Sequence, residues 1–575
     1  MHAADAATML RRFDITTSSM RAIPASVTAA LLLITAQAAL AGQPATPAAM
    51  AAYAEQLLDG QKIAPDGPGV TVLVARGNQL LYKGARGMAS VELGVPLRPD
   101  QLMRIGSVTK QFAAAALLKQ VDAGKAALDD PLSKYLPDYP SGSKITLLQL
   151  LNHTSGVKSY TGIPGYMDGP IRRDLTTAAL IKEFRDQPVD FAPGEKWAYN
   201  NSGYVLLGAV VEAISGKSWH QSLDELLLQP AGIKTVLYPD PNRLFKGMAQ
   251  GYTLNAERQV APAGFLSMTQ PHAAGALVAN TEGLWRWNQA LHGGQLISPA
   301  IYQRMITPEG VAQPARYGFG IAAVTLRGQP MLSHGGGIHG FVSMLNYLPR
   351  TQTTVVILRN TDGPGFSMDL VSRKLAAFAI GEPFTDPRPV AVPADQLKPL
   401  EGVYAREGQP TRTLRVKDGV LHNQRSGGSS VALVPLGNDR FAFPNSLAWL
   451  QVERGADGRA VALQLSNTGE DDAERWTRTG DLPADLAFIT LAPEQVQALL
   501  GDYASPQFAI RVFLDAEGQL KGQAQGQPAF LLRASTPRRV HVTEVDATLE
   551  FSAEADRPQS ATLLQGANKI VMVRK

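Results

Sequence analysis

The chain has 575 residues, of which 45% are hydrophobic and 18% charged, and its formal net charge is +4. These ordinary values exclude a wholly disordered chain and a strongly basic nucleic-acid-binding polypeptide. At roughly 150 residues per domain, the length predicts three or four domains. Cysteine is absent, which excludes disulfides, thiolate metal sites and a cysteine nucleophile.

The first element in chain order is an apolar run over residues 23–41, which follows Arg21 and ends in Ala39-Leu40-Ala41. A basic start, an apolar segment and small residues at the cut are the layout of a signal peptide. The run is rich in alanine and short for a bilayer, so a membrane-spanning helix is the weaker alternative. We therefore predict that residues 1–41 are a signal peptide, that the protein is periplasmic or secreted, and that no stable membrane span remains after cleavage.

Residues 48–382 form the next predicted domain, with strand patterns at both ends and helical patterns between them. The strand patterns are apolar hairpins over residues 70–82 and 341–359. Helical spacing is found over residues 108–123, 176–186, 203–214, 282–291 and 369–380. This order favours a sheet built from both ends of the domain and covered by helices.

Residues 383–395 are rich in proline, which is typical of a stiff linker. After them the sequence repeats itself, because Gly402 and Tyr404 recur 99 residues later as Gly501 and Tyr503. Both copies continue as short segments of alternating apolar residues, typical of small antiparallel barrels. We predict β-barrel domains over residues 396–480 and 490–575, and we expect them to give structural support or restrict substrates rather than form an independent ligand site.

Ser107 and Lys110 are the first candidate catalytic pair. A serine needs an adjacent base to become a nucleophile, and a lysine three residues later on a helix lies on the same face. Two other Ser-x-x-Lys stretches, at residues 141–144 and 155–158, lie among glycines and serines, whereas Ser107 opens a long helix-forming run. Taken alone, the pair is as readily a helix N-cap with a solvated lysine.

Tyr199 and Asn201 are the second candidate motif. Of the 15 tyrosines, only Tyr199 has asparagine two positions later. A phenol beside a lysine can move the serine proton, and an asparagine amide can hold both the lysine and a substrate amide. Taken alone, these residues would be a turn and a helix N-cap.

His334 and Gly336 belong to the third motif, a His-Gly-Gly-Gly run ahead of the strand expected at residue 341. Glycines beside a strand let a substrate backbone pair with its edge, and His334 would point into the same cleft. Residues 335–340 also match G-x-G-x-x-G, but a dinucleotide site needs a helix after this run. No further histidine or acidic residue nearby in sequence completes a metal site with His334 and His339. We expect no metal and no cofactor.

Together, the ordered motifs resemble the serine β-lactamase-related, penicillin-recognising hydrolase family, which includes class C β-lactamases, D-Ala-D-Ala carboxypeptidases, esterases and D-aminopeptidases. The resemblance covers roughly residues 50–380. It extends to further stretches: Arg104-Ile105-Gly106, Leu128-Asp129-Asp130-Pro131, Tyr135-Leu136-Pro137, Leu150-Leu151-Asn152-His153-Thr154-Ser155-Gly156 and Gly203-Tyr204. It implies an α+β fold, with a β-lactamase/transpeptidase-like domain whose antiparallel sheet is flanked by helices. Two small lipocalin-like antiparallel barrels would follow, the layout of the D-aminopeptidase members.

The resemblance also implies the roles of the candidate residues. Ser107 would be the acyl-accepting nucleophile, with Lys110 and Tyr199 as its proton-transfer pair. Substrate binding would fall to the remaining motif residues, Asn201, His334 and Gly336. The oxyanion hole would use the backbone N–H of Ser107 and a second N–H near residues 338–341.

His334 stands where β-lactamases of this family often have lysine. A lysine carries a fixed positive charge for a substrate carboxylate, whereas histidine is mostly neutral at pH 7. The histidine therefore favours the D-aminopeptidase and esterase branches. In D-aminopeptidases a loop from the last barrel enters the active site, and residues 533–539 are the candidate here, although they carry no carboxylate for a substrate amine.

We therefore predict an exported serine hydrolase that forms an acyl-enzyme on small amides or esters, with D-amino-acid peptides or amides as the leading substrates. The alternatives are a β-lactamase or D-Ala-D-Ala carboxypeptidase, or a short-chain esterase. A non-catalytic cell-wall-binding protein is less favoured because the candidate catalytic residues are intact. The expected partner is a small molecule or short peptide and not nucleic acid, and a homodimer is compatible with the sequence.

Overall fold

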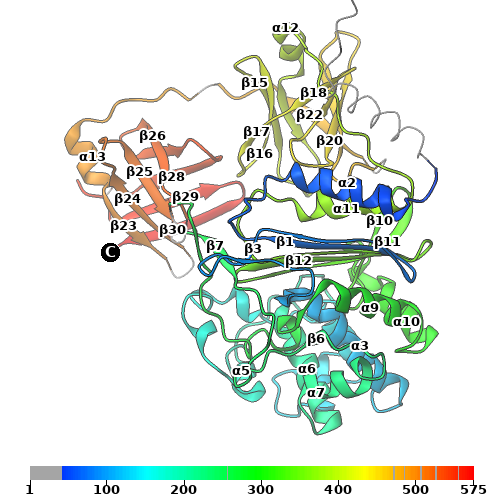
Figure 1. Cartoon of the computed structure of the whole chain (residues 1–575). Helices are drawn as coiled ribbons and strands as arrows, with labels where there is room; N and C mark the ends of the chain where they lie inside the picture. The colour runs from blue at the N-terminus through cyan, green and yellow to red at the C-terminus, as the bar shows by residue number, and fades with distance from the viewer. Residues whose placement is uncertain are drawn as a thin grey trace, which may run out of the picture.

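The computed structural model describes residues 42–255, 257–470, 473–484, 486–505, 508–524, 527–553 and 556–575. The predicted signal peptide, residues 1–41, lies outside the described residues. Figure 1 shows a large N-terminal domain with a sheet between two layers of helices, and two β-rich domains after it. Within the described ranges, no helix has both the length and the apolar character needed to cross a membrane.

The N-terminal domain is built on a six-stranded antiparallel sheet with the order β10-β11-β12-β13-β1-β2. The strands are β1 (Val70–Arg76), β2 (Gln79–Arg86), β10 (Ala322–Leu326), β11 (Gln329–Ile338), β12 (Phe341–Leu348) and β13 (Thr353–Arg359). Val70 lies opposite Arg359, so the two ends of the domain meet in one sheet. The prediction of such a sheet is confirmed. The sequence did not reveal β11, which contains the whole His-Gly-Gly-Gly run that we had placed ahead of a strand.

Helices cover both faces of this sheet (Figure 1). One face carries α2 (Pro47–Asp59) and α11 (Met368–Ala379), which pack on an apolar cluster with Val72 and Ile357. The other face carries the larger helical layer with α3 (Thr109–Asp122), α6 (Asn201–Ser215) and α9 (Thr281–His292). The shorter helices are α4 (Leu147–Leu151), α5 (Thr177–Lys182), α7 (Trp219–Leu223), α8 (His272–Gly275) and α10 (Pro299–Ile306). The shorter strands are β3 (Met88–Ser90), β4 (Val95–Pro96), β5 (Met103–Arg104), β6 (Val236–Leu237), β7 (Tyr252–Leu254), β8 (Val260–Pro262) and β9 (Val278–Ala279).

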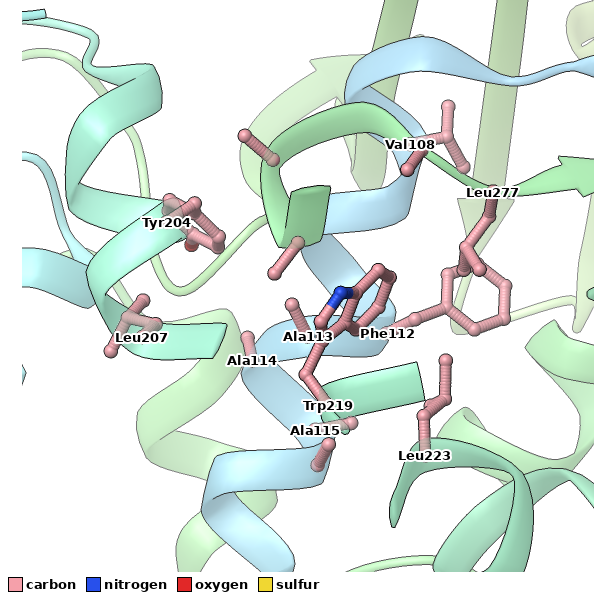
Figure 2. Packing of buried hydrophobic residues seen from close by; sticks show 14 of the residues in the cluster. Val108, Phe112, Ala113, Ala114, Ala115, Tyr204, Leu207, Trp219, Leu223 and Leu277 are labelled. Carbon is pink, nitrogen blue, oxygen red and sulfur yellow. The ribbon is translucent and has the colours of Figure 1, made fainter. Parts of the chain in front are cut away.

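Helix α3 runs through the middle of the helical layer. Its alanine run, residues 113–116, is fully buried, and Figure 2 shows Trp219 and the α6 side chains Tyr204 and Leu207 around it. Alanine side chains let neighbouring helices approach closely and favour helix formation. This packing holds the first turn of α3 in a fixed position.

The first β-rich domain is a nine-stranded antiparallel sheet, and the second is a closed eight-stranded barrel. The first contains β14 (Gly402–Ala405), β15 (Arg412–Lys417), β16 (Val420–Arg425), β17 (Ser430–Ala432), β18 (Val434–Gly437), β19 (Arg440–Ala442), β20 (Trp449–Arg454), β21 (Ala460–Ser466) and β22 (Glu474–Gly480), after the short α12 (Ala394–Leu397). The second follows α13 (Pro493–Leu499) and contains β23 (Gly501–Ala504), β24 (Ala509–Leu514), β25 (Leu520–Ala524), β26 (Phe530–Thr536), β27 (Arg539–Val542), β28 (Ala547–Phe551), β29 (Ser560–Gln565) and β30 (Asn568–Arg574). The predicted α+β fold with two small antiparallel barrels is confirmed.

The two barrels share one anchor. The Tyr404 hydroxyl donates to the Leu400 carbonyl at 2.6 Å, and the Tyr503 hydroxyl donates to the Leu499 carbonyl at 2.9 Å. An arginine from the last strand of each barrel donates to the carbonyl of the residue after that leucine. Arg478 donates to Glu401, and Arg574 donates to Leu500. The sequence repeat therefore preserves the same hydrogen bonds at the start and end of each barrel.

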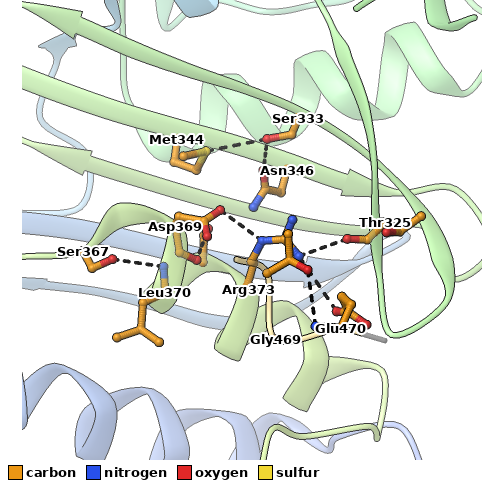
Figure 3. Close-up of polar contacts among 12 residues, drawn as sticks. Thr325, Ser333, Met344, Asn346, Ser367, Asp369, Leu370, Arg373, Gly469 and Glu470 are labelled. Carbon is orange, nitrogen blue, oxygen red and sulfur yellow. Dashed lines mark hydrogen bonds and ion pairs between the residues drawn. The ribbon is translucent and has the colours of Figure 1, made fainter. Parts of the chain in front are cut away.

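A polar cluster around the buried Arg373 and Glu470 joins the first barrel to the N-terminal domain (Figure 3). Glu470 accepts the backbone N–H of Arg327 at 2.9 Å and lies 3.9 Å from the guanidinium of Arg373. Arg373, on α11, also donates to Asp369 and to the Thr325 carbonyl, both at 3.0 Å. This buried cation is thus surrounded by acceptors, as burial of a charge requires.

Candidate active site

Ser107 lies in a 3₁₀ turn, Gly106–Val108, that leads into α3. The turn packs backbone to backbone on β11, because a Cβ at Gly106 would lie 3.0 Å from the Gly337 nitrogen and one at Gly336 would lie 2.0 Å from the Ile105 carbonyl oxygen. Gly106 also has φ +50°, which favours glycine. Only glycine at these positions lets Ser107 approach the strand so closely.

Gly337 brings a free backbone donor to Ser107. Strands β11 and β12 are joined by a two-residue turn, with Ile338 opposite Phe341, so Ile338, Gly336 and His334 face β12 with their N–H groups and Gly337 faces away. On that side β10 pairs with β11 only as far as Ser333. The Gly337 N–H therefore lies at an open edge beside the Ser107 turn. We had expected the second oxyanion donor near residues 338–341, and the geometry points to the residue just before that range.

Lys110 is completely buried one helical turn after Ser107. Its Nζ lies 2.8 Å from Asn201 Oδ1, 2.9 Å from the Ala274 carbonyl oxygen and 3.2 Å from Ser107 Oγ. Burial lowers its pKa well below the ordinary lysine value of 10.5. A neutral amine has two N–H donors and one lone pair. The Asn201 and Ala274 oxygens can only accept, so they take the two N–H groups. The lone pair therefore faces the Ser107 hydroxyl, which can donate.

Tyr199 is the third member of the group at Ser107. Lys110 Nζ lies 4.7 Å from the centre of its ring. Although 39% of the residue is exposed, desolvation of its hydroxyl raises the pKa of Tyr199, and the nearby Ser107 hydroxyl lowers it by a smaller amount. The phenol is therefore protonated at neutral pH and can give a proton to an atom bound near Ser107.

Asn201 is fixed at the first residue of α6, where Asn200 caps the helix by accepting the Gly203 N–H at 2.8 Å. Its Oδ1 accepts from Lys110 and its Nδ2 donates to Thr161 Oγ1 at 3.0 Å. The structure thus brings together Ser107, Lys110, Tyr199 and Asn201, from segments far apart in sequence.

His334 is placed behind this group rather than on the wall of the cavity at Ser107. Its Nδ1 lies 2.6 Å from the Gly335 carbonyl oxygen, so Nδ1 carries the proton, and its Nε2 then accepts from the Tyr317 hydroxyl at 2.8 Å. Burial lowers the pKa of His334 to about 4. His334 is therefore neutral at pH 7, with both nitrogens occupied inside the protein. Gly336 likewise serves the packing on Ile105.

His153 was quoted for the family resemblance but was given no role. It is 1% exposed and has φ +65°, and its Nδ1 accepts the Asn200 N–H at 3.2 Å. Its ring centre lies 4.5 Å from that of Tyr199 and 4.7 Å from that of Tyr317. His153 thus supports both Tyr199 and the start of α6. No sequence signal pointed to Tyr317.

A cavity of about 360 Å³ opens at Ser107. Its wall includes Ser107, Asn201 and Gly337, and is otherwise largely apolar, with Tyr160, Met167, Ile171, Leu266 and Ile338. Residues 533–539, our candidate loop, form part of the β26–β27 hairpin and do not line this cavity. Across the described ranges, no three acidic or histidine side chains are grouped so that they could hold a metal ion.

A serine whose hydroxyl faces a buried lysine and a tyrosine, beside two backbone N–H groups, defines a serine hydrolase. The beta-lactamase family matches residues 45–379, more than half of the chain. The chain belongs to this family.

Two characterised relatives and one solved structure illustrate the similarity. Esterase EstB of Burkholderia gladioli is 37% identical over 180 residues, 29% of this chain and 46% of the esterase. The D-aminopeptidase of Gluconobacter oxydans (strain 621H) is 26% identical over 351 residues, 59% of this chain and 65% of that enzyme. The octameric penicillin-binding protein homologue from Pyrococcus abyssi shares the fold, with a TM-score of 0.54 and 23% identity over 74% of this chain and 99% of that one.

The contact between β11 and the serine turn predicts a strong effect of Gly336→Ala. The added Cβ would lie 2.0 Å from the Ile105 carbonyl oxygen and 2.4 Å from Ser343 Oγ, and a displacement of about 1 Å in a catalytic group costs about a hundredfold in rate. We expect kcat/KM to fall at least about a hundredfold. The control is Gly335→Ala, because a Cβ at Gly335 would meet nothing closer than 3.6 Å. The fold-loss of kcat/KM in this variant should be at least about ten times smaller than in Gly336→Ala. Equal losses would contradict the role of this contact.

The buried Lys110 predicts a characteristic pH profile. Its lowered pKa keeps the amine neutral, so hydrolysis should be close to its plateau at pH 8 and should change less than about threefold between pH 8 and pH 10. A solvated lysine would instead give a rate that rises about tenfold per pH unit up to its ordinary value of 10.5. Measuring kcat/KM from pH 4 to pH 10 separates the two cases. In His334→Gln the alkaline plateau should persist, because the pKa of His334 is about 4.

Proposed function

We propose that the protein hydrolyses small amides or esters through an acyl-enzyme on Ser107, and that D-amino-acid peptides and amides are its leading substrates. The observation that carries this proposal is the position of Lys110, whose two acceptor-only partners leave its lone pair facing Ser107 Oγ at 3.2 Å. This is the geometry of a general base next to its nucleophile.

In the proposed first step, Lys110 takes the proton of Ser107 while Oγ forms a bond to the substrate carbonyl carbon. The negative oxygen that develops is bound by the N–H groups of Ser107 and Gly337. Tyr199 then gives a proton to the leaving nitrogen or oxygen, and the bond to that atom breaks. The Lys110 ammonium restores the tyrosine proton. A water molecule repeats the sequence on the ester carbonyl and releases the acid, while Asn201 holds Lys110 and orients the substrate.

Three observations support small substrates with a D-amino-acid residue. The cavity at Ser107 is about 360 Å³ and mostly apolar, which is near the lower end of the size range of small-molecule sites. His334 is neutral and has both nitrogens occupied, so it offers no charge for the carboxylate that penicillins carry at that position. The similarity to the Gluconobacter oxydans D-aminopeptidase agrees with the small cavity and with the neutral His334. A short-chain esterase is the second candidate, supported by the 37% identity to EstB.

The second barrel is suited to restricting substrate access. Leu254 and Asn255, at the end of β7, line a cavity of about 640 Å³ together with Tyr503 and Arg511 of the barrel. The same segment continues through β8 to Leu266, which lines the cavity at Ser107. We propose that the barrel holds this segment and thereby limits the size of substrates.

The hydrolase proposal predicts covalent labelling and a substrate order. A serine-reactive fluorophosphonate should label the protein, and Ser107→Ala should abolish labelling because, among the described residues, Ser107 carries the hydroxyl that contacts Lys110. In a panel of D-alanine p-nitroanilide, its L-isomer, short-chain esters and nitrocefin, we expect the D-anilide to have the highest kcat/KM by at least about tenfold. Unchanged labelling in Ser107→Ala would contradict the nucleophile. If nitrocefin or an ester had the highest kcat/KM, the proposed substrate class would be wrong, but the assignment as a serine hydrolase would stand.

We further propose that the protein is exported and loses residues 1–41. The fold engages the chain immediately after this point, since the Gly42 N–H donates to the Gly381 carbonyl at 2.8 Å. Expression of the full sequence in a Gram-negative host should therefore give a periplasmic protein that begins at Gly42. Intact-mass measurement of the periplasmic and cytoplasmic fractions tests this. A full-length protein confined to the cytoplasm would contradict export.

A further inference from the structure

A second cavity of about 300 Å³ lies next to the one at Ser107. Its wall includes Arg104, Gly251, Phe265, His339 and Phe341. His339 belongs to the walls of both cavities, and Phe341 lies opposite Ile338, which lines the first. The two cavities therefore meet at the β11–β12 turn.

Arg104 is the charged group of this second cavity. It lies on β5, three residues before Ser107, so the two Cα atoms are at most about 10 Å apart. The guanidinium carbon lies 5.7 Å from the centre of the Phe341 ring. The side chain is half-buried, and burial lowers its pKa.

The guanidinium of Arg104 has no carboxylate within 4 Å among the residues that the structure describes. Arg373 in the same domain shows what a buried arginine usually has, with Asp369, the Thr325 carbonyl and Glu470 around it. A cation withdrawn from water without an anion is costly. Arginine also presents a planar set of donors that matches a carboxylate with two parallel hydrogen bonds. The unmatched charge therefore suits an anion that arrives with the substrate.

We propose that Arg104 binds the carboxylate of a short peptide substrate in this second cavity. The inference rests on the proposed hydrolase function and deepens it. The residue whose carbonyl is attacked would occupy the cavity at Ser107. The leaving amino acid would pass the β11–β12 turn and place its carboxylate on the guanidinium. Carboxylate recognition would thus move from the position of His334, which is neutral, to a residue on the strand before the nucleophile.

The test compares D-alanyl-D-alanine with its C-terminal amide, which differs only in lacking the negative charge. Cleavage of the bond between the two residues is followed by mass spectrometry in the full-length protein. The wild type should prefer the free acid in kcat/KM, and Arg104→Gln should reduce the ratio of acid to amide by about ten- to a hundredfold, the usual worth of a charge-assisted hydrogen bond. Arg104→Lys keeps the charge but loses the planar donors, so its acid-to-amide ratio should lie between those of the wild type and Arg104→Gln. The control Arg98→Gln, an exposed arginine on the same segment, should keep the wild-type ratio.

A binding measurement keeps the two proposals separable. In a Ser107→Ala background, titration calorimetry should give a Kd at least about tenfold lower for the acid than for the amide, and Arg104→Gln should remove this difference. An equal loss on both peptides, as misfolding would give, or an unchanged acid-to-amide ratio would overturn the role of Arg104. If the wild type cleaves neither peptide, the proposed function on these substrates fails, and the Kd ratio alone decides for or against Arg104.

Discussion

The whole site depends on one close contact between two stretches of backbone. The turn that carries Ser107 touches β11 without any side chain between them, which is possible only because Gly106 and Gly336 stand at the contact. The contact is reinforced from the next strand, where the Ser343 hydroxyl donates to the Ile105 carbonyl at 2.7 Å. This contact fixes the position of helix α3, which packs through its alanines, relative to the sheet. The distance between the nucleophile and the strand edge follows from that contact.

The second constraint is the exclusion of net charge from the interior of the site. Burial lowers the pKa values of Lys110, His153 and His334, and desolvation of the hydroxyl raises that of Tyr199 although 39% of this residue is exposed, so each is held in its neutral form. Neutral groups can exchange a proton without leaving an isolated charge in a low-dielectric environment. Arg104, at the border of this region, is the exception, which is why we assign it a charged ligand.

The sequence revealed the elements whose signals are local. Helix α3, helix α6 and the repeat of Tyr404 at Tyr503 could all be predicted, because periodicity and spacing lie within a short window. Strand β11 was missed, since three successive glycines indicate a turn when nothing shows what packs on them. The burial of His334 and the contacts of Tyr317, His153 and Ala274 could not be foreseen either. These contacts join residues that lie 17 positions apart (Tyr317 and His334), 47 apart (His153 and Asn200) and 164 apart (Lys110 and Ala274). No local sequence pattern records such contacts.

The sheet that joins both ends of the domain also has a consequence for how the chain acquires its structure. Strand β1 lies between β2 and β13, and Val70 meets Arg359 only after about 290 further residues have been made. A chain emerging from the ribosome therefore holds β1 and β2 as an incomplete hairpin, which is marginally stable by itself. Folding of the domain waits for its last strands. For a protein proposed to cross a membrane before it works, this delay keeps the chain in the extended state that a translocation channel accepts.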